Sequence, residues 1–215
     1  MSRLRIAPIV EGHGEVHAIR LLLDRVWREL LGGEYAETLK PVRCPRSKLL
    51  KHTPQGASVP DPHELGRAVG LAAAKLSAVD TGALPALILV LVDADSDCPA
   101  TLVPGIRQMA AEHARGLDVA CVMAKLEYET WFVAAAESLG DHLSLGEDDV
   151  VPEDPEQTGA RKAWIEKRFK GGKYSETVDQ PKMTAKMDLQ LCRRRSPSFD
   201  KLCRELEQRI ETRRS

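Results

Sequence analysis

Aromatic residues are scarce in this sequence of 215 residues, at 4%. That scarcity argues against a protein that binds single-stranded nucleic acid by stacking bases on aromatic rings. Five cysteines form no CxxC pair and no metal-ligand spacing, and their odd number and scatter indicate a reducing cytoplasm. The longest apolar run, PALILVLV, is far shorter than a membrane span, and the N-terminus lacks the apolar stretch of a signal peptide. We therefore expect a cytoplasmic protein without a membrane partner.

Charge is distributed unevenly, although the formal net charge is only -1. Residues 1–155 carry 15 Lys/Arg against 23 Asp/Glu, a net of -8, and residues 156–215 carry 16 against 9, a net of +7. A basic tail on an acidic body is typical of proteins with a phosphate-rich partner. A solvated, charged helix end explains the same distribution equally well.

Apolar periodicity predicts alternating strands and helices. The expected strands are 5–10, 40–44, 84–92 and 118–124, and the expected helices are 15–31, 63–79, 100–115 and 129–138. The run LPALILVLV is apolar on both faces, which favours the centre of a parallel sheet. The pattern predicts an α/β, Rossmann-like, mostly parallel sheet flanked by helices, with ligands at the carboxyl ends of the strands.

The chain divides into three expected parts. Residues 1–140 form the core, residues 141–157 an acidic linker or surface excursion, and residues 158–215 a basic, mainly helical C-terminal extension.

Carboxylates follow three of the expected strands. They are Glu11 and Glu15 after the first, Asp93, Asp95 and Asp97 after the third, and Glu127 and Glu129 after the fourth. Since parallel strands end at one edge of a sheet, these like charges would repel one another without a cation. Carboxylate oxygens suit hard ions such as Mg²⁺ or Mn²⁺, and we expect one or two of them here. The simpler alternatives are a helix start with acids that complement its dipole, and a solvated acidic turn.

Other known site patterns fit the stretch EGHGEVH poorly. It lacks the GK[ST] of a phosphate-binding Walker loop, and His17 stands where the dinucleotide fingerprint needs its third glycine. His13 and His17 have the spacing of a zinc pair, but Glu15 lies midway, on the wrong side of a helix to assist. DADSD is no EF-hand, because Cys98 stands where that loop needs glycine.

These residues resemble the TOPRIM domain of topoisomerases, primases and overcoming-lysogenisation-defect (OLD) nucleases. The hallmark glutamate after the first strand matches Glu11, and the Asp-x-Asp after the third matches Asp93 and Asp95. The second glutamate of OLD-type nucleases matches Glu15, and their later glutamate matches Glu127 or Glu129, of which Glu127 is preferred as nearer the strand end. More closely, IVEGHGE, DAD, KLEYETWF and SETVDQPKMTAKMD resemble small bacterial stand-alone TOPRIM-like proteins.

The resemblance implies hydrolysis of nucleic-acid phosphodiesters, in RNA or DNA, with Mg²⁺ or Mn²⁺ as cofactor. Glu11, Asp93 and Asp95 would be catalytic, together with a lysine from beyond the core, for which Lys182 and Lys186 are candidates. It also implies a role in bacterial antiviral defence beside a separately encoded ATPase. A homodimer is compatible with the sequence. The alternatives are a non-catalytic TOPRIM-like binding or regulatory subunit, and a metal-dependent phosphatase of small phosphate esters.

Two further groups are expected to contact the substrate. Glycines on both sides of a histidine would let the backbone pass close to phosphate, and basic residues would supply affinity for a polyanion. The expected contacts are Gly12, His13 and Gly14 in the turn, Arg43, Arg46 and Lys48 in the loop that follows the second strand, and Arg193, Arg194 and Arg195 in the tail.

Overall fold

The protein is built around a parallel sheet of five strands. The computed structural model describes residues 3–79, 84–146, 149–157 and 159–211. The strands are β1 (Arg3–Val10), β2 (Tyr35–Thr38), β3 (Val42–Arg43), β6 (Ala86–Asp93) and β7 (Asp118–Ala124). Their order is β2-β1-β6-β7, and β3 also pairs with β1, beyond the end of β2. All pairs are parallel, so the α/β fold class is confirmed.

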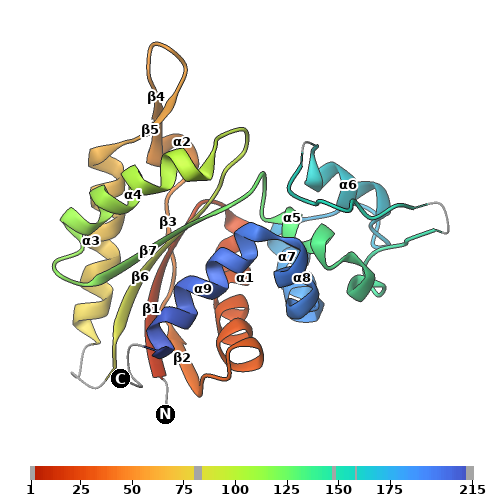
Figure 1. Ribbon diagram of the computed structural model, residues 1–215, viewed down its shortest axis with the longest axis horizontal. Coiled ribbons are helices and arrows are strands. Elements are labelled where there is room, and N and C mark those ends of the chain that lie inside the picture. Colours follow the sequence, from red (N-terminus) through yellow and green to blue (C-terminus); the bar gives the residue numbers. More distant parts are fainter. Residues whose placement is uncertain (1–2, 80–83, 147–148, 158, 212–215) are drawn as a thin grey trace.

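Helices cover both faces of this sheet (Figure 1). Helices α3 (Pro62–Ala78) and α4 (Pro99–His113) lie on one face, and α1 (His13–Arg25) and α9 (Pro197–Glu211) lie on the other. Alternate residues of each strand feed two separate hydrophobic clusters, one on each face. None of the helices in the described part of the chain has the length and apolarity needed to cross a membrane.

Shorter elements join these layers. They are the π-helix η1 (Val26–Leu30), α2 (Arg46–Leu49), β4 (Leu50–His52), β5 (Ser58–Pro60), α5 (Glu129–Ala134), the 3-10 helix η2 (Ala136–Leu139), α6 (Arg161–Arg168), α7 (Glu176–Lys186) and α8 (Leu189–Arg195). Strands β4 and β5 form an antiparallel hairpin that projects from the body (Figure 1). Helices α5, α6, α7 and α8 gather beside the sheet, next to α1 and α9.

The strongest sequence signals are confirmed. The run at 84–92 is β6, which lies between β1 and β7, and the strand predicted at 118–124 has those bounds in the structure. Helix α3 begins as expected, because the Asp61 carboxylate accepts hydrogen bonds from the amides of His63 and Glu64. The strand predicted at 40–44 is shorter, and β2 was not expected; its four residues give too short an alternation to stand out.

The C-terminal helices belong to the same hydrophobic core as the sheet. Helix α7 packs along α1. Phe199, Leu202 and Leu206 of α9 are fully buried in the cluster that also contains Ile6 and Leu89 of the sheet. The basic extension therefore covers one face of the sheet and reaches the carboxyl ends of its strands.

Candidate metal and substrate site

The turn after β1 holds two glycines because side chains crowd against it. A Cβ atom added to Gly12 would lie 2.3 Å from Glu15 Oε2, and one added to Gly14 would lie 2.1 Å from Gln180 Oε1 of α7. Both distances are far below van der Waals contact. The glycines therefore let Glu15 fold back against the turn and let α7 approach the start of α1.

Four acids from three strand ends influence one another electrostatically. The pKa of Glu11 is raised from 4.5 to about 7, chiefly by burial, with contributions from the charges of Asp95 and Glu15. Burial also holds the pKa of Asp93 well above its usual value, and Glu15, Glu11 and Glu129 add to that shift. Burial raises the pKa of Glu129 from 4.5 to about 7. The structure therefore brings Glu11, Glu15, Asp93 and Glu129 into one group, which we call the inner acids.

One oxygen of this group lacks a partner. Glu15 is 8% exposed, and its Oε2 atom is buried without a hydrogen-bond partner among the described residues. Gln180 Oε1, next to Gly14, is likewise buried without a hydrogen-bond partner among the described residues. Burial raises the pKa of Glu15, and the charge of Glu176 adds to it. Buried oxygens without donors suit a cation, whereas a neutral core would have satisfied or replaced them.

The donor set fits a hard divalent ion by its chemistry, since it consists of carboxylate and amide oxygens. It is not preformed. In residues 3–79, 84–146, 149–157 and 159–211, no group of three or more His, Cys, Asp or Glu side chains has the geometry of a finished metal site. An ion would therefore have to draw the inner acids together by side-chain rotation.

Asp95 and Asp97 already have a cation of their own. Arg46 Nε donates to Asp95 Oδ2 at 2.7 Å, and the same guanidinium pairs with Asp97. Strand β6 ends at Asp93, and Asp95 adopts a left-handed φ of 48°. The strand alternation that would send Asp93 and Asp95 to one side does not extend this far. The charge of Asp95 still contributes to the raised pKa values of both Glu11 and Asp93.

Glu127 and Glu129 have different surroundings. Glu127 Oε2 accepts a hydrogen bond of 2.8 Å from the Lys162 amide in the first turn of α6. Glu129 is 4% exposed, accepts a hydrogen bond of 2.8 Å from Tyr174 Oη, and acts on Asp93. Leu126 has a φ of 65°, so the chain turns sharply between the strand end and the two acids. Proximity along the sequence favoured Glu127, whereas the structure places Glu129 among the inner acids.

Helix α7 contributes residues that the sequence did not single out. Glu176 pairs with Lys162 of α6, and the charges of Glu176 and Glu129 raise the pKa of Lys162. The expected lysines lie elsewhere on α7: Lys182 pairs with Asp179 at 3.0 Å, and Lys186 is exposed at the last turn. Only the tertiary contact between α7 and α1 brings Glu176 and Gln180 to the turn, and no spacing in the sequence indicates it.

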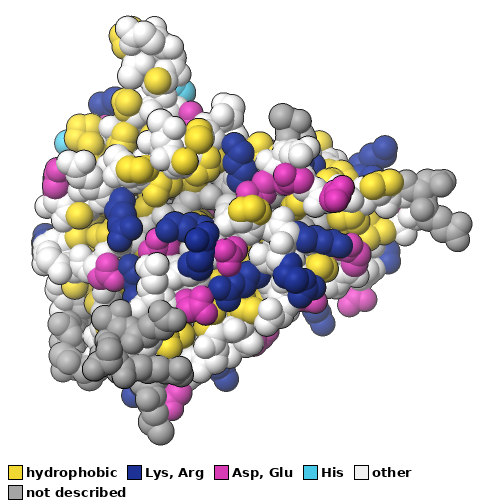
Figure 2. All heavy atoms as spheres, in the orientation of Figure 1, with side chains coloured by type: hydrophobic (Ala, Val, Ile, Leu, Met, Phe, Trp, Pro, Cys, Tyr) yellow, Lys and Arg dark blue, Asp and Glu magenta, His cyan; other side chains and the backbone are white. Residues whose placement is uncertain are grey.

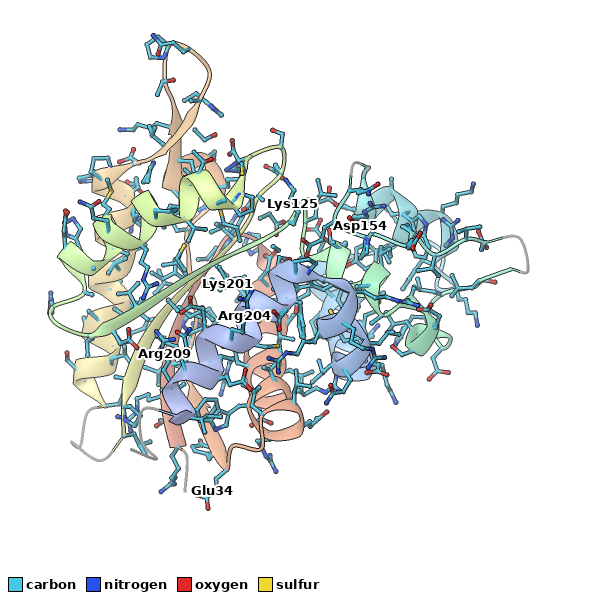
Figure 3. The ribbon with its side chains drawn as sticks, viewed as in Figure 1. Glu34, Lys125, Asp154, Lys201, Arg204 and Arg209 are labelled. Carbon is cyan, nitrogen blue, oxygen red and sulfur yellow. The ribbon has the colours of Figure 1, made fainter. Side chains whose placement is uncertain are left out.

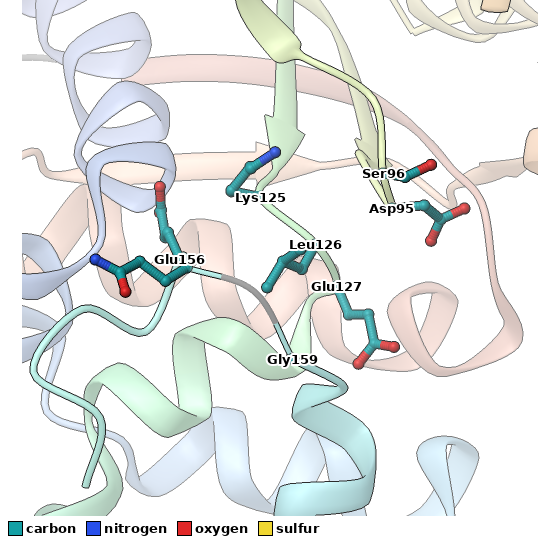
Figure 4. A pocket seen from close by; sticks show the side chains of 8 residues that line it. Asp95, Ser96, Lys125, Leu126, Glu127, Glu156 and Gly159 are labelled. Carbon is teal, nitrogen blue, oxygen red and sulfur yellow. The ribbon is translucent and has the colours of Figure 1, made fainter.

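Two hollows open at this edge of the sheet. One, of about 510 Å³, is lined by Glu11, Arg46, His52 and Asp95, among others. The second, of about 680 Å³, lies between the turns after β6 and β7 and contains Asp95, Lys125 and Glu127 (Figure 4). Glu11 is the inner acid that lines a hollow, so a substrate would reach the inner acids from the side of Glu11.

The expected basic contacts differ in how free they are. His13, Arg43 and Lys48 are exposed near the carboxyl edge of the sheet. Arg193 is held between Asp200 and Glu207, each at 2.9 Å, and Arg195 pairs with Glu137 at 2.7 Å. Arg194 is exposed. Two of the three tail arginines thus already have carboxylate partners within the protein.

Fold and site together define an α/β protein with a group of buried acids at the carboxyl edge of a parallel sheet. The chain belongs to the DUF4276 family, described as a domain of unknown function, and the match covers residues 10–207. Searches of curated proteins and of solved structures gave no match. The family description names no activity.

Proposed function

We propose that the protein is a Mg²⁺- or Mn²⁺-dependent nuclease that hydrolyses nucleic-acid phosphodiesters. The observation that carries the proposal is the group of inner acids, whose pKa values are raised chiefly by burial and also by the charges of neighbouring carboxylates. A divalent cation would convert this repulsion into attraction, and it would satisfy the unpartnered Glu15 Oε2. The resemblance of IVEGHGE and DAD to TOPRIM nucleases supports the same chemistry.

The inner acids would hold one or two ions, which supply Lewis acidity toward the phosphate and a more acidic bound water. Arg46, which lines the same hollow as Glu11, and the exposed His13 would contact phosphate oxygens of the substrate. Lys162 carries its charge next to Glu176 and Glu129, which makes it a third candidate for the lysine that Lys182 and Lys186 represent by resemblance. Glu127 would position α6, and with it Lys162, through the amide hydrogen bond.

The biological role is part of the same proposal. The resemblance supports an effector of bacterial antiviral defence that works with a separate ATPase, as a monomer or a homodimer. All five cysteines are free, and four are buried, which supports a reducing compartment such as the cytoplasm.

A non-catalytic binding or regulatory subunit is the second candidate. It is favoured by Arg46, whose guanidinium neutralises Asp95 and Asp97 without any metal. On that reading the acids near Arg46 are structural, and the protein would bind a partner and hydrolyse nothing.

Thermal melting of the wild type, Asp93→Ala and the exposed control Asp141→Ala, in EDTA and in excess Mg²⁺, tests the proposal. The wild type and the control should melt at a higher temperature with Mg²⁺, because only the folded state assembles the site. Asp93→Ala should lose most of that rise and all hydrolysis of labelled RNA and DNA. An equal rise in all three proteins would show that Asp93 is not part of a metal site, and it would refute the proposed nuclease. A rise that depends on Asp93 without any hydrolysis would favour the non-catalytic subunit.

A further inference from the structure

Three neighbouring hollows form a row, because each shares lining residues with the next. The hollow beside Glu11 and the larger one next to it share Asp95 and Ser96. The larger one shares Lys125 and Glu156 with a third hollow of about 500 Å³. The row of hollows, which we call the groove, therefore extends from Glu11, past Lys125, to the first turns of α9, where Lys201 and Arg204 lie (Figure 3).

The third hollow lies along the outer edge of the sheet, and we call it the β7 groove. Helices α4 and α9 form its walls, and in the described part of the chain no strand pairs with the outer side of β7. Its surface is largely apolar, with contributions from Pro99, Val103, Pro104, Val122, Met123 and Pro197. Lys125, Lys201 and Arg204 supply positive charge around this apolar surface. Figure 2 shows basic side chains gathered along α9 on this face, with acids between them.

The basic side chains of the β7 groove are available to a ligand. Lys201 pairs with Glu205 and Arg204 with Asp200, each four residues apart on α9. Arg204 is 55% exposed and its partner Asp200 is partly exposed, and such a surface pair contributes little and exchanges easily. Lys201 is 42% exposed, and its buried partner Glu205 also pairs with Arg209, so Glu205 keeps one cation when Lys201 turns to a ligand. Lys125 Nζ donates to a backbone carbonyl, that of Asp97, at 3.2 Å.

The acids that line the groove are already engaged. Glu156 Oε1 accepts from Ser196 Oγ at 2.6 Å and from the Ser198 amide at 2.7 Å, at the start of α9. Glu127 accepts from the Lys162 amide, and Asp95 pairs with Arg46. The charge that remains exchangeable along the β7 groove is therefore mainly positive.

We propose that the β7 groove binds a single-stranded stretch of nucleic acid, with phosphates against Lys125, Lys201 and Arg204 and bases on the apolar floor. This inference rests on the proposed function, which places the scissile phosphate beside the inner acids. A duplex keeps its bases stacked inside, so the apolar floor would have no counterpart, whereas a single strand presents bases and phosphates together. The third hollow has no aromatic lining residue, so the bases would contact aliphatic side chains and proline rings and would not stack on aromatic rings.

Fluorescence anisotropy with labelled oligo(dT), oligo(U) and a matched duplex tests the inference. All proteins carry Asp93→Ala and are measured in Mg²⁺, so that hydrolysis does not interfere. Lys201→Glu/Arg204→Glu should weaken binding of at least one single strand by at least about tenfold and reduce its log–log salt slope by about 1.4, at about 0.7 for each lost phosphate contact. The single strand should also bind more tightly than the duplex.

Two further variants make the test specific. Lys167→Glu/Lys173→Glu changes the net charge equally at two exposed positions away from the groove, and it should leave affinity within about twofold. Lys201→Arg/Arg204→Lys keeps the charges and should retain binding.

Several results would overturn the inference. They are equal weakening by both charge reversals, absence of oligonucleotide binding to the parent protein, tighter binding of the duplex, and retained affinity in Lys201→Glu/Arg204→Glu. The last result would indicate that the groove binds a different ligand, such as an extended peptide that pairs with the edge of β7. None of these results bears on the metal, which the melting of Asp93→Ala tests separately.

Discussion

Replacing Glu129 with glutamine should stabilise the metal-free protein at alkaline pH. Glu129 is 4% exposed, and its pKa rises from 4.5 to about 7 on folding, chiefly through burial. Below pH 4.5 the carboxyl group is protonated in both states. Between pH 4.5 and about 7 the unfolded state ionises while the folded state still holds the proton, so stability falls across this window, and the full loss is present above about pH 7. Glutamine has the same shape and can still accept the hydrogen bond from Tyr174.

The size of the effect follows from the shift. The difference between 4.5 and about 7 corresponds to about 3.4 kcal/mol, at about 1.36 kcal/mol for each pKa unit. Glutamine leaves a polar amide buried at this position, and the cost of burying it offsets part of the gain, so we expect a net gain of about 1 to 3 kcal/mol. For a protein of this length that gain raises the melting temperature by about 3 to 9 °C.

The assay is thermal melting in EDTA at acidic, neutral and alkaline pH. The control is Glu112→Gln, an exposed position on α4. Glu129→Gln should match the wild type at acidic pH and exceed it increasingly through neutrality, whereas the control should follow the wild type throughout. A gain that is the same at all pH values, or no gain at alkaline pH, would refute the electrostatic reasoning. With saturating Mg²⁺ the order should reverse, because the wild type retains every ligand.

Three other predictions follow from contacts at the site. Gly12→Ala should displace the Glu15 carboxylate, because the new Cβ atom would lie 2.3 Å from its Oε2 atom, and should reduce the Mg²⁺-induced rise in melting temperature. Arg46→Met should lower the melting temperature in EDTA, since Asp95 and Asp97 lose their shared partner, and Mg²⁺ should recover more of this loss than NaCl of equal ionic strength. Lys162→Met should slow hydrolysis of labelled RNA or DNA while leaving the Mg²⁺-induced rise in place, because the lysine pairs with Glu176 and the inner acids remain.

The sheet was predictable because its signals are local. Strands β6 and β7 are continuous apolar runs, and a parallel sheet requires their carboxyl ends to meet at one edge. From that topology alone, the acids that follow three of the strands are predicted to lie at the same edge. The hairpin of β4 and β5 was missed, since its three-residue strands lie in a stretch rich in proline and glycine that reads as an irregular loop.

The detail of the site was beyond reach of the sequence because it depends on turns and on tertiary contacts. The chain turns at Leu126, which has a left-handed φ, and beyond this turn Glu129 is the glutamate whose charge acts on Asp93. Arg46 meets Asp95 across 49 positions of sequence, and only the path of the chain after β3 brings them together. The charge counts also predicted that the tail arginines bind a polyanion. The contacts in the structure show that Arg193 is held by two carboxylates, whereas Lys201 and Arg204 of α9 each pair with one acid four residues away.

The two kinds of acid at this edge indicate where an ion would enter. Asp95 and Asp97 are satisfied by Arg46, so they add little affinity unless that guanidinium moves. No inner acid forms an ion pair with a Lys or Arg side chain of the described residues, and Glu176 and Gln180 of α7 lie against the turn that holds Glu15. The family match extends from the end of β1 into α9, so α7 and the inner acids belong to one family unit. An ion held by the inner acids would lie at the head of the groove, where Arg46 and Lys125 can take up the phosphates on either side of it.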